Sequence, residues 1–294
     1  MIKFNLVCFA ALICLLLTPR IEAQEDNFPV STEFYFGQKP PGDTPELFSP
    51  GVVSRDNYFE HSSAVFSPDL REVYWSAKAD GKRYFDMFVS QFKNDRWTEP
   101  RIVSFLDTNY SSMGPAISPD GEELYFDKDN DIWVVKRQGG GWSEPERVSD
   151  ISIPGRSEWV GSVTQDGSIY FKVTTISPRV DRIYVARRSA DGFSAPSELG
   201  VNFQSGYVGI GGVYVAPDES YMILELQLDK RSSGLFVSYS IGENSWTPLV
   251  NLPLGFGRFP GVSPDGRYIF YVTHSGIHWV SANILERLRP DQSE

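Results

Sequence analysis

The chain has 294 residues, of which 41% are hydrophobic, 14% aromatic and 22% charged, and its formal net charge is −11. This composition is that of a globular protein and excludes the collagen-like, coiled-coil, disordered and multi-span membrane classes. The acidic balance, without any cluster of basic residues, excludes nucleic acid and anionic membrane surfaces as expected partners.

Residues 1–23 have the pattern of a secretory signal peptide. Lys3 precedes the apolar run LVCFAALICLLL at 6–17, which is too short to span a bilayer, and Ala23 supplies a small residue at a cleavage point. A lipid anchor would need a small residue immediately before Cys14, and the residue there is isoleucine. Both cysteines lie in this segment. We therefore expect an exported chain, periplasmic or extracellular, with no disulfide and no membrane span.

One motif recurs five times along the rest of the chain. It joins a short apolar strand, a Pro-Asp-Gly type turn and a second, aromatic-rich strand, as in AISPDGEELYF at 116–126. Pro presets the first turn dihedral, Asp accepts hydrogen bonds from the turn backbone and Gly takes the positive φ, so we interpret the aspartates as structural. They are separated by 51, 46, 52 and 47 residues, the length of a four-stranded propeller blade: Asp69, Asp120, Asp166, Asp218 and Asp265.

Two further strand signatures follow each turn. The third strand places an aliphatic residue before a ring, as in IWV at 132–134, and the fourth has a Trp-x-x-Pro pattern, as in WTEP at 97–100. Proline lacks the ladder donor, so the fourth strand belongs at the outer edge of a blade. The fifth repeat lacks this strand, whereas the extended segment 44–53 has no partner of its own. We predict that this segment pairs with the last repeat and closes the ring.

These signatures predict an all-β fold, a β-propeller of four-stranded blades. Five blades occupy 55–281, an N-terminal segment at 24–54 supplies the ring-closing strand, and a short helix and tail follow at 282–294. A six-bladed ring is the alternative, although it would need about 50 more residues than the spare segment provides. We expect a monomer.

The repeated SPDG turn followed by an aromatic-rich strand resembles the TolB-type propeller repeat, a relative of the WD repeat. The resemblance covers about 55–281, and the stretch FYFGQKPPGDTPELFSPGVVS at 34–54 is similar to the leader of a group of secreted bacterial propellers. Gln165 replaces Pro in the third turn, and Leu70 and Glu219 replace Gly in the first and fourth. The family includes interaction scaffolds and propellers appended to peptidases, so the function must be argued from the site.

In a propeller the natural site is the mouth of the central channel, formed by the loops that enter the innermost strands: 58–61, 111–114, 157–160, 206–209 and 256–259. We predict a ring of ligand-contacting residues from these loops: Glu60, His61, Glu158, Tyr207 and Arg258. Glu60 and Glu158 lie two blades apart, which could match the separation of paired glycosidase carboxylates. Loop Glu and Arg residues also form solvated ion pairs, and that interpretation stays open.

Other motifs give weaker evidence for a functional site. His274 and His278 have a metal-pair spacing but no third ligand, and His278 takes the slot of a core ring. The acidic run 127–131 has Ile132 and Gln138 where a helical calcium loop needs Gly and Glu, so we interpret it as a solvated hairpin turn. The chain has no Gly-x-Ser-x-Gly elbow, and no Cys follows the leader. We expect no metal, no cofactor and no catalytic residue.

Two functions follow from these observations. The leading one is a secreted or periplasmic, non-catalytic propeller that binds a protein or a ligand, small-molecule or glycan, through its channel mouth. The alternative is a carbohydrate-active enzyme that uses the paired channel carboxylates. A propeller that gates a separate peptidase would need a partner chain.

Overall fold

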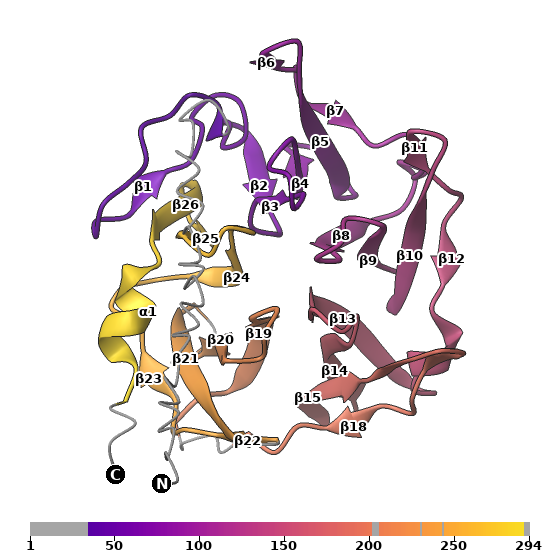
Figure 1. Ribbon diagram of the computed structural model, residues 1–294, viewed down its shortest axis with the longest axis vertical. Helices are drawn as coiled ribbons and strands as arrows, with labels where there is room; N and C mark the ends of the chain where they lie inside the picture. The colour runs from indigo at the N-terminus through magenta and orange to yellow at the C-terminus, as the bar shows by residue number, and fades with distance from the viewer. Residues whose placement is uncertain (1–34, 202–205, 230, 243, 291–294) are drawn as a thin grey trace, which may run out of the picture. The chain divides into compact units, whose positions relative to one another are not determined.

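The computed structural model describes residues 35–201, 206–229, 231–242 and 244–290. The predicted signal peptide, residues 1–23, lies outside the described residues. Almost all regular structure in the described part is β-strand, and its antiparallel sheets stand side by side around a ring (Figure 1). Within this part of the chain, no helix is long and apolar enough to cross a membrane.

The sheets form five blades, and the first four are built from the ring centre outward in chain order. The first contains β2 (Tyr58–Glu60), β3 (Val65–Phe66), β4 (Glu72–Ala79), β5 (Asp86–Lys93), β6 (Arg96–Trp97) and β7 (Arg101–Ile102). The second contains β8 (Ser112–Ile117), β9 (Glu123–Lys128), β10 (Asp131–Gln138), β11 (Gly141–Trp142) and β12 (Glu146–Arg147). The third contains β13 (Arg156–Val163), β14 (Ile169–Ile176), β15 (Arg179–Ala186), β16 (Arg188–Ser189), β17 (Gly192–Phe193) and β18 (Ser197–Glu198).

The remaining strands complete the ring. The fourth blade contains β19 (Gly209–Val215), β20 (Tyr221–Gln227), β21 (Ser233–Gly242), β22 (Ser245–Trp246) and β23 (Val250–Asn251). The fifth contains β24 (Arg258–Val262), β25 (Tyr268–Thr273), β26 (Gly276–Ser281) and the N-terminal β1 (Glu46–Leu47), and the helix α1 (Asn283–Leu288) follows it. The prediction of a five-bladed propeller is confirmed, and the chain does not adopt the six-bladed alternative.

Each Pro-Asp turn is held by its own side chains. Asp120 Oδ1 accepts the Ser118 hydroxyl at 2.5 Å and the Glu122 N–H at 3.0 Å. The equivalent backbone N–H is accepted by the turn aspartates of the other repeats: Asp69, Asp166, Asp218 and Asp265. Leu70 and Glu219 hold a φ of 58° where glycine stands in the other turns. The hydrogen bonds confirm the structural role of these carboxylates.

The outermost strand of each of the first four blades is broken at a proline. In the first blade, β6 pairs with the end of β5 and β7 pairs with its middle, and Pro100 lies in the break. Thr98 spans the break, because its N–H donates to Gln91 O at 2.8 Å and its Oγ1 accepts the Gln91 N–H at 3.0 Å. The fourth strand is therefore two short pieces instead of the single strand that the Trp-x-x-Pro pattern predicts, since proline cannot donate to the ladder.

The two ends of the propeller domain meet in the fifth blade. β1 pairs antiparallel with β26, with Glu46 opposite Trp279 and Leu47 opposite His278. The next residue, Phe48, donates its N–H to Ile277 O at 2.8 Å. This pairing confirms the predicted ring closure by an N-terminal strand.

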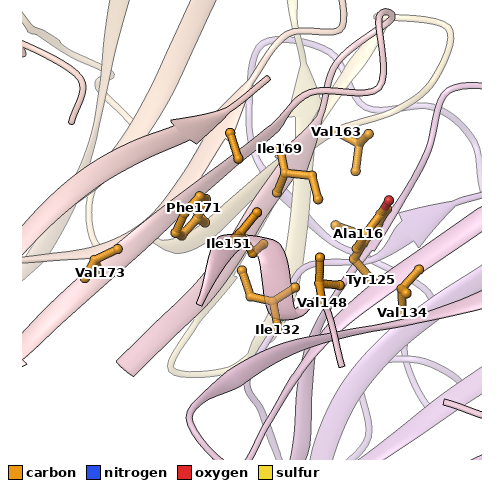
Figure 2. Packing of buried hydrophobic residues seen from close by; sticks show 11 residues of the cluster. Ala116, Tyr125, Ile132, Val134, Val148, Ile151, Val163, Ile169, Phe171 and Val173 are labelled. Carbon is orange, nitrogen blue, oxygen red and sulfur yellow. The ribbon is translucent and has the colours of Figure 1, made fainter. Parts of the chain in front are cut away.

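The hydrophobic core lies between neighbouring blades. Figure 2 shows the layer between the second and third blades, where side chains from both sheets interdigitate. Ile132 and Tyr125 of the second blade pack there with Ile169 and Phe171 of the third. Because every strand alternates its side chains between two such layers, each blade depends on both neighbours for burial.

Phe48→Ala should strongly destabilise the fold. The Phe48 ring is fully buried, and its centroid lies 5.0 Å from that of Phe270 and 5.1 Å from that of Trp279. Removing a buried ring costs about 3–5 kcal/mol. Urea unfolding measures the change, and Phe59→Ala, at a ring that is 48% exposed, is the matched control. Equal stability losses in the two variants would contradict the role of Phe48 in closure.

Asp120→Ala should lower the free energy of unfolding by about 1–2 kcal/mol, because the turn loses two acceptor contacts. Glu122→Ala changes an exposed carboxylate in the same turn and should leave the urea midpoint nearly unchanged. Equal losses of stability in the two variants would mean that removal of a negative charge, and not loss of the turn hydrogen bonds, lowers the free energy of unfolding.

Candidate functional site

The innermost strands are bulged where they face the ring centre. Pairing with the second strand shifts register between Met113 and Ala116 in β8 and between Ile210 and Val213 in β19. Equivalent shifts occur in β13 and β24. A bulge withdraws the backbone and interrupts the ladder. It thereby opens the wall of the inner strand to a side chain of the strand behind it.

One equivalent position of the second strand lies at or beside these bulges. In each repeat a carbonyl at the start of the second strand accepts the backbone N–H that closes the Pro-Asp turn, as Glu123 O accepts the Ser118 N–H. The position lies four residues after this carbonyl. In the five blades this position is occupied by Ser76, Asp127, Lys172, Glu225 and Val272. Three consecutive blades therefore place a charged side chain behind the innermost strand.

Glycine in the bulges makes room for these side chains. A Cβ atom on Gly114 would lie 2.6 Å from Asp127 Oδ2, and one on Gly211 would overlap the Glu225 carboxylate. Gly114 also has a φ of 59°. Residues with a larger side chain cannot occupy either position while the carboxylates keep their places.

A cavity of about 550 Å³ occupies the channel, and all five blades contribute to its lining. At the end where the inner strands begin, which we call the mouth, the lining side chains are His61, Asp127, Trp159, Lys172, Arg179, Gln227, Arg258 and Phe259. At the opposite end the lining comes from the Pro-Asp turns: Pro68, Pro119, Gln165, Pro217 and Pro264. The charged groups are therefore concentrated toward the mouth.

Lys172 differs from the other two cations of the lining, Arg179 and Arg258, each of which lies within ion-pair distance of a carboxylate. Its Nζ donates to the Ile210 carbonyl at 3.3 Å and lies 5.1 Å from the centre of the Trp159 ring. Within the described residues, no carboxylate oxygen comes within ion-pair distance of this nitrogen. Burial lowers the pKa of Lys172, although the neighbouring carboxylates of Asp181, Glu225 and Asp127 act in the opposite direction.

Asp127 and Glu225 have different surroundings. Asp127 is buried, and its Oδ1 accepts the Val160 N–H at 2.6 Å. Burial raises the pKa of Asp127 well above its usual range. Glu225 accepts the N–H groups of Gly212 at 2.9 Å and Phe259 at 3.1 Å, and Arg258 Nε lies 3.3 Å from it. Glu225 is thus neutralised within the wall.

The channel contains two of the five residues predicted to contact a ligand. His61 and Arg258 line it. The His61 ring lies between the rings of Phe85 and Phe259, with centroids 4.8 and 4.4 Å away. Burial, together with the charge of Arg258, lowers the pKa of His61 to about 4. The imidazole is therefore neutral at physiological pH.

The other three predicted residues lie outside the channel lining. Glu60 is buried, its Oε1 has no hydrogen-bond partner among the described residues, and burial raises its pKa. Glu158 accepts the Ile153 N–H at 2.8 Å, and burial, reinforced by the charge of Asp131, raises its pKa to about 7. Tyr207 packs against the core layer between the third and fourth blades.

The sequence interpretation missed Asp127, Lys172 and Glu225. We assigned Asp127 to a solvated hairpin turn, but only Asp129 and Asn130 form that turn, and Asp127 is buried in β9. Aligning the second strands of the repeats would have shown charges at a position where alternation predicts an inward side chain. Among the described residues, no group of three His, Cys, Asp or Glu side chains is placed to hold a metal.

No protein-family model and no curated protein matches this chain. Among solved structures it is similar to TolB from Acinetobacter baumannii, with 15% identity, a TM-score of 0.48, and coverage of 77% of this chain and 52% of that one. A putative TolB from Agrobacterium tumefaciens gives 17% identity, a TM-score of 0.48, and coverage of 74% and 70%. An oligogalacturonate lyase from Vibrio parahaemolyticus gives 11% identity, a TM-score of 0.46, and coverage of 76% and 66%.

This chain thus spans about half the length of the Acinetobacter TolB structure. The strand pairing of the five blades defines the fold independently of these likenesses. The five-bladed propeller predicted from the Pro-Asp repeats is confirmed by this strand pairing, and at these identities the comparisons say nothing about activity.

Glu158→Gln should change how stability depends on pH. A carboxyl whose pKa rises from 4.5 in the unfolded chain to about 7 in the folded one contributes fully below pH 4.5, and this contribution is lost as the pH rises toward 7. The neutral amide avoids that loss. The stability of the variant relative to the parent, measured by urea unfolding, should therefore increase between pH 5 and pH 8. A difference that is constant with pH would contradict the assignment.

Proposed function

We propose that this protein is an exported, monomeric and non-catalytic binding scaffold, and that its channel holds a small organic anion that enters through the mouth. The observation that carries the proposal is Lys172, a cation without an ion pair among the described residues, facing a cavity of about 550 Å³. Burying an unpaired ammonium is costly, and an anionic ligand would offset that cost. The cavity volume is within the usual range for small-molecule sites.

The apolar surroundings of Lys172 support a ligand with an apolar body. The rings of Trp159 and Phe259 line the mouth beside the charged groups. Around the mouth, at the starts of inner strands or at the hairpins between second and third strands, lie five of the six exposed large apolar side chains in the described part of the chain. They are Phe59, Tyr110, Ile176, Val208 and Leu228. Exposed apolar groups gathered at one end favour binding there.

The structure gives no support to the carbohydrate-active alternative. That function required Glu60 and Glu158 to face each other across the channel, and neither belongs to its lining. Export remains part of the proposal, based on the signal-peptide pattern of residues 1–23.

Lys172→Met should weaken the binding of benzoate, which combines a carboxylate with an apolar ring, by at least about tenfold. Quenching of Trp159 fluorescence reports the binding, and Trp159→Phe identifies that signal among the seven tryptophans. Lys128→Met removes the same charge near the mouth but outside the lining, and should bind benzoate normally. Absence of benzoate binding to the parent protein, or equal weakening in both lysine variants, would contradict the proposal.

A further inference from the structure

Lys172 differs from the other lysines in both accessibility and environment. Of the lysines that the structure describes, it alone lines the channel. Its ammonium group can donate three hydrogen bonds. Among the described residues it donates one, to the Ile210 carbonyl at 3.3 Å. The rest of the group faces the cavity and the Trp159 ring. A ligand in the channel can therefore reach this nitrogen without displacing a carboxylate.

Two acidic neighbours of Lys172, Asp181 and Glu225, are already engaged by other partners. Asp181 accepts the Thr174 hydroxyl at 2.7 Å and the Ile210 N–H at 3.1 Å. Glu225 is held by Arg258 and two backbone N–H groups. Arg179 and Arg258 add positive charge at the mouth. Burial is the largest effect on Lys172 and lowers its pKa, which favours the neutral, nucleophilic amine relative to an exposed lysine.

Asp127 lines the same cavity as this amine, where its carboxyl can donate and accept protons. Its carboxyl is bonded to the N–H of Val160. Val160 directly follows Trp159, the residue that pairs with Lys172 across β13 and β14. Burial raises the pKa of Asp127 well above its usual range, which favours the protonated carboxyl. An amine and a buried carboxyl thus share one cavity.

We propose that Lys172 captures a small 2-oxo acid or aldehyde acid in the channel as a reversible imine. This inference rests on the proposed function, since it specifies the organic anion as one that also carries a reactive carbonyl. Removal from water in an apolar pocket activates a lysine amine for imine formation with a carbonyl compound.

The step balances within the site. The neutral Lys172 amine attacks the carbonyl carbon, a C–N bond forms, and the carbonyl oxygen becomes a hydroxyl after proton transfer through Asp127. Asp127 then protonates this hydroxyl, the C–O bond breaks and water leaves, while the nitrogen lone pair forms the C=N bond. The nitrogen keeps one proton. The products are a protonated imine, the Asp127 carboxylate and one water molecule, so two neutral groups become an ion pair.

The positive imine nitrogen remains next to the carboxylate of the ligand. The same position that attracts the anion thus stabilises the covalent product, and hydrolysis reverses the step. No oxidant or reductant is needed, and the reaction is binding and not turnover.

Reductive trapping tests the proposal directly. The full mature chain is incubated with glyoxylate and sodium cyanoborohydride at pH 7, and the carboxymethylated lysines are mapped by peptide mass spectrometry. We expect Lys172 to be modified at least about tenfold faster than Lys78 and Lys128, which lie near the mouth outside the channel lining. Labelling spread evenly over the lysines, or following surface exposure alone, would overturn the inference.

Two variants test the amine and the carboxyl, and benzoate binding to the parent protein measures anion binding separately. Lys172→Arg loses the nucleophilic amine, so glyoxylate labelling at this position should disappear. Asp127→Asn should slow labelling of Lys172 by about tenfold or more, with the urea midpoint as a folding control. If benzoate binds the parent protein and Lys172 is not labelled preferentially, the imine proposal fails and anion binding stands. If benzoate does not bind and Lys172 is labelled, the proposed function fails instead.

Discussion

The withdrawal of the inner-strand backbone at its bulges determines what this channel can do. An unbroken inner strand would present only its own side chains to the ring centre, and the second strand would remain hidden behind it. The bulges in β8 and β19 leave room for Asp127 and Glu225 of the second strands, and Lys172 occupies the equivalent position beside the bulge of β13. Glycine is the residue that permits this, because Gly114 and Gly211 leave the volume that the carboxylates occupy.

The rigidity of the site comes from the layers between the blades. Ile169 and Phe171 are buried against the second blade (Figure 2) and Tyr170 is buried against the fourth, so the strand that carries Lys172 is packed on both sides. Two of the charged groups also accept hydrogen bonds from the backbone N–H groups at the bulges. Glu225 holds the N–H groups of Gly212 and Phe259, and Asp127 holds that of Val160. Lys172 has no ion-pair partner among the described residues, so an anionic ligand can supply one.

The repeats made the architecture predictable from sequence, whereas the site was only partly so. Pro-Asp turns and their spacing are local signals, and the missing fourth strand of the last repeat indicated closure by the segment containing Leu47. The predicted loops lie at the starts of the inner strands, but whether a loop side chain points into the channel depends on tertiary packing. Glu158 turns away to bind the Ile153 N–H, and Lys172 reaches the channel from a strand through a bulge that no local pattern marks.

Ring closure also has a consequence for how the chain reaches its native state. The contacts that fasten the fifth blade join residues 223 positions apart, as between Ser54 and Ile277. Such a separation gives the closing step a high contact order and a large loop-closure entropy. The segment that must complete the last blade is made near the beginning of synthesis, yet its partner emerges among the final strands. Until then the growing domain is an open array with an unpaired edge, and such an edge is prone to pair with another chain.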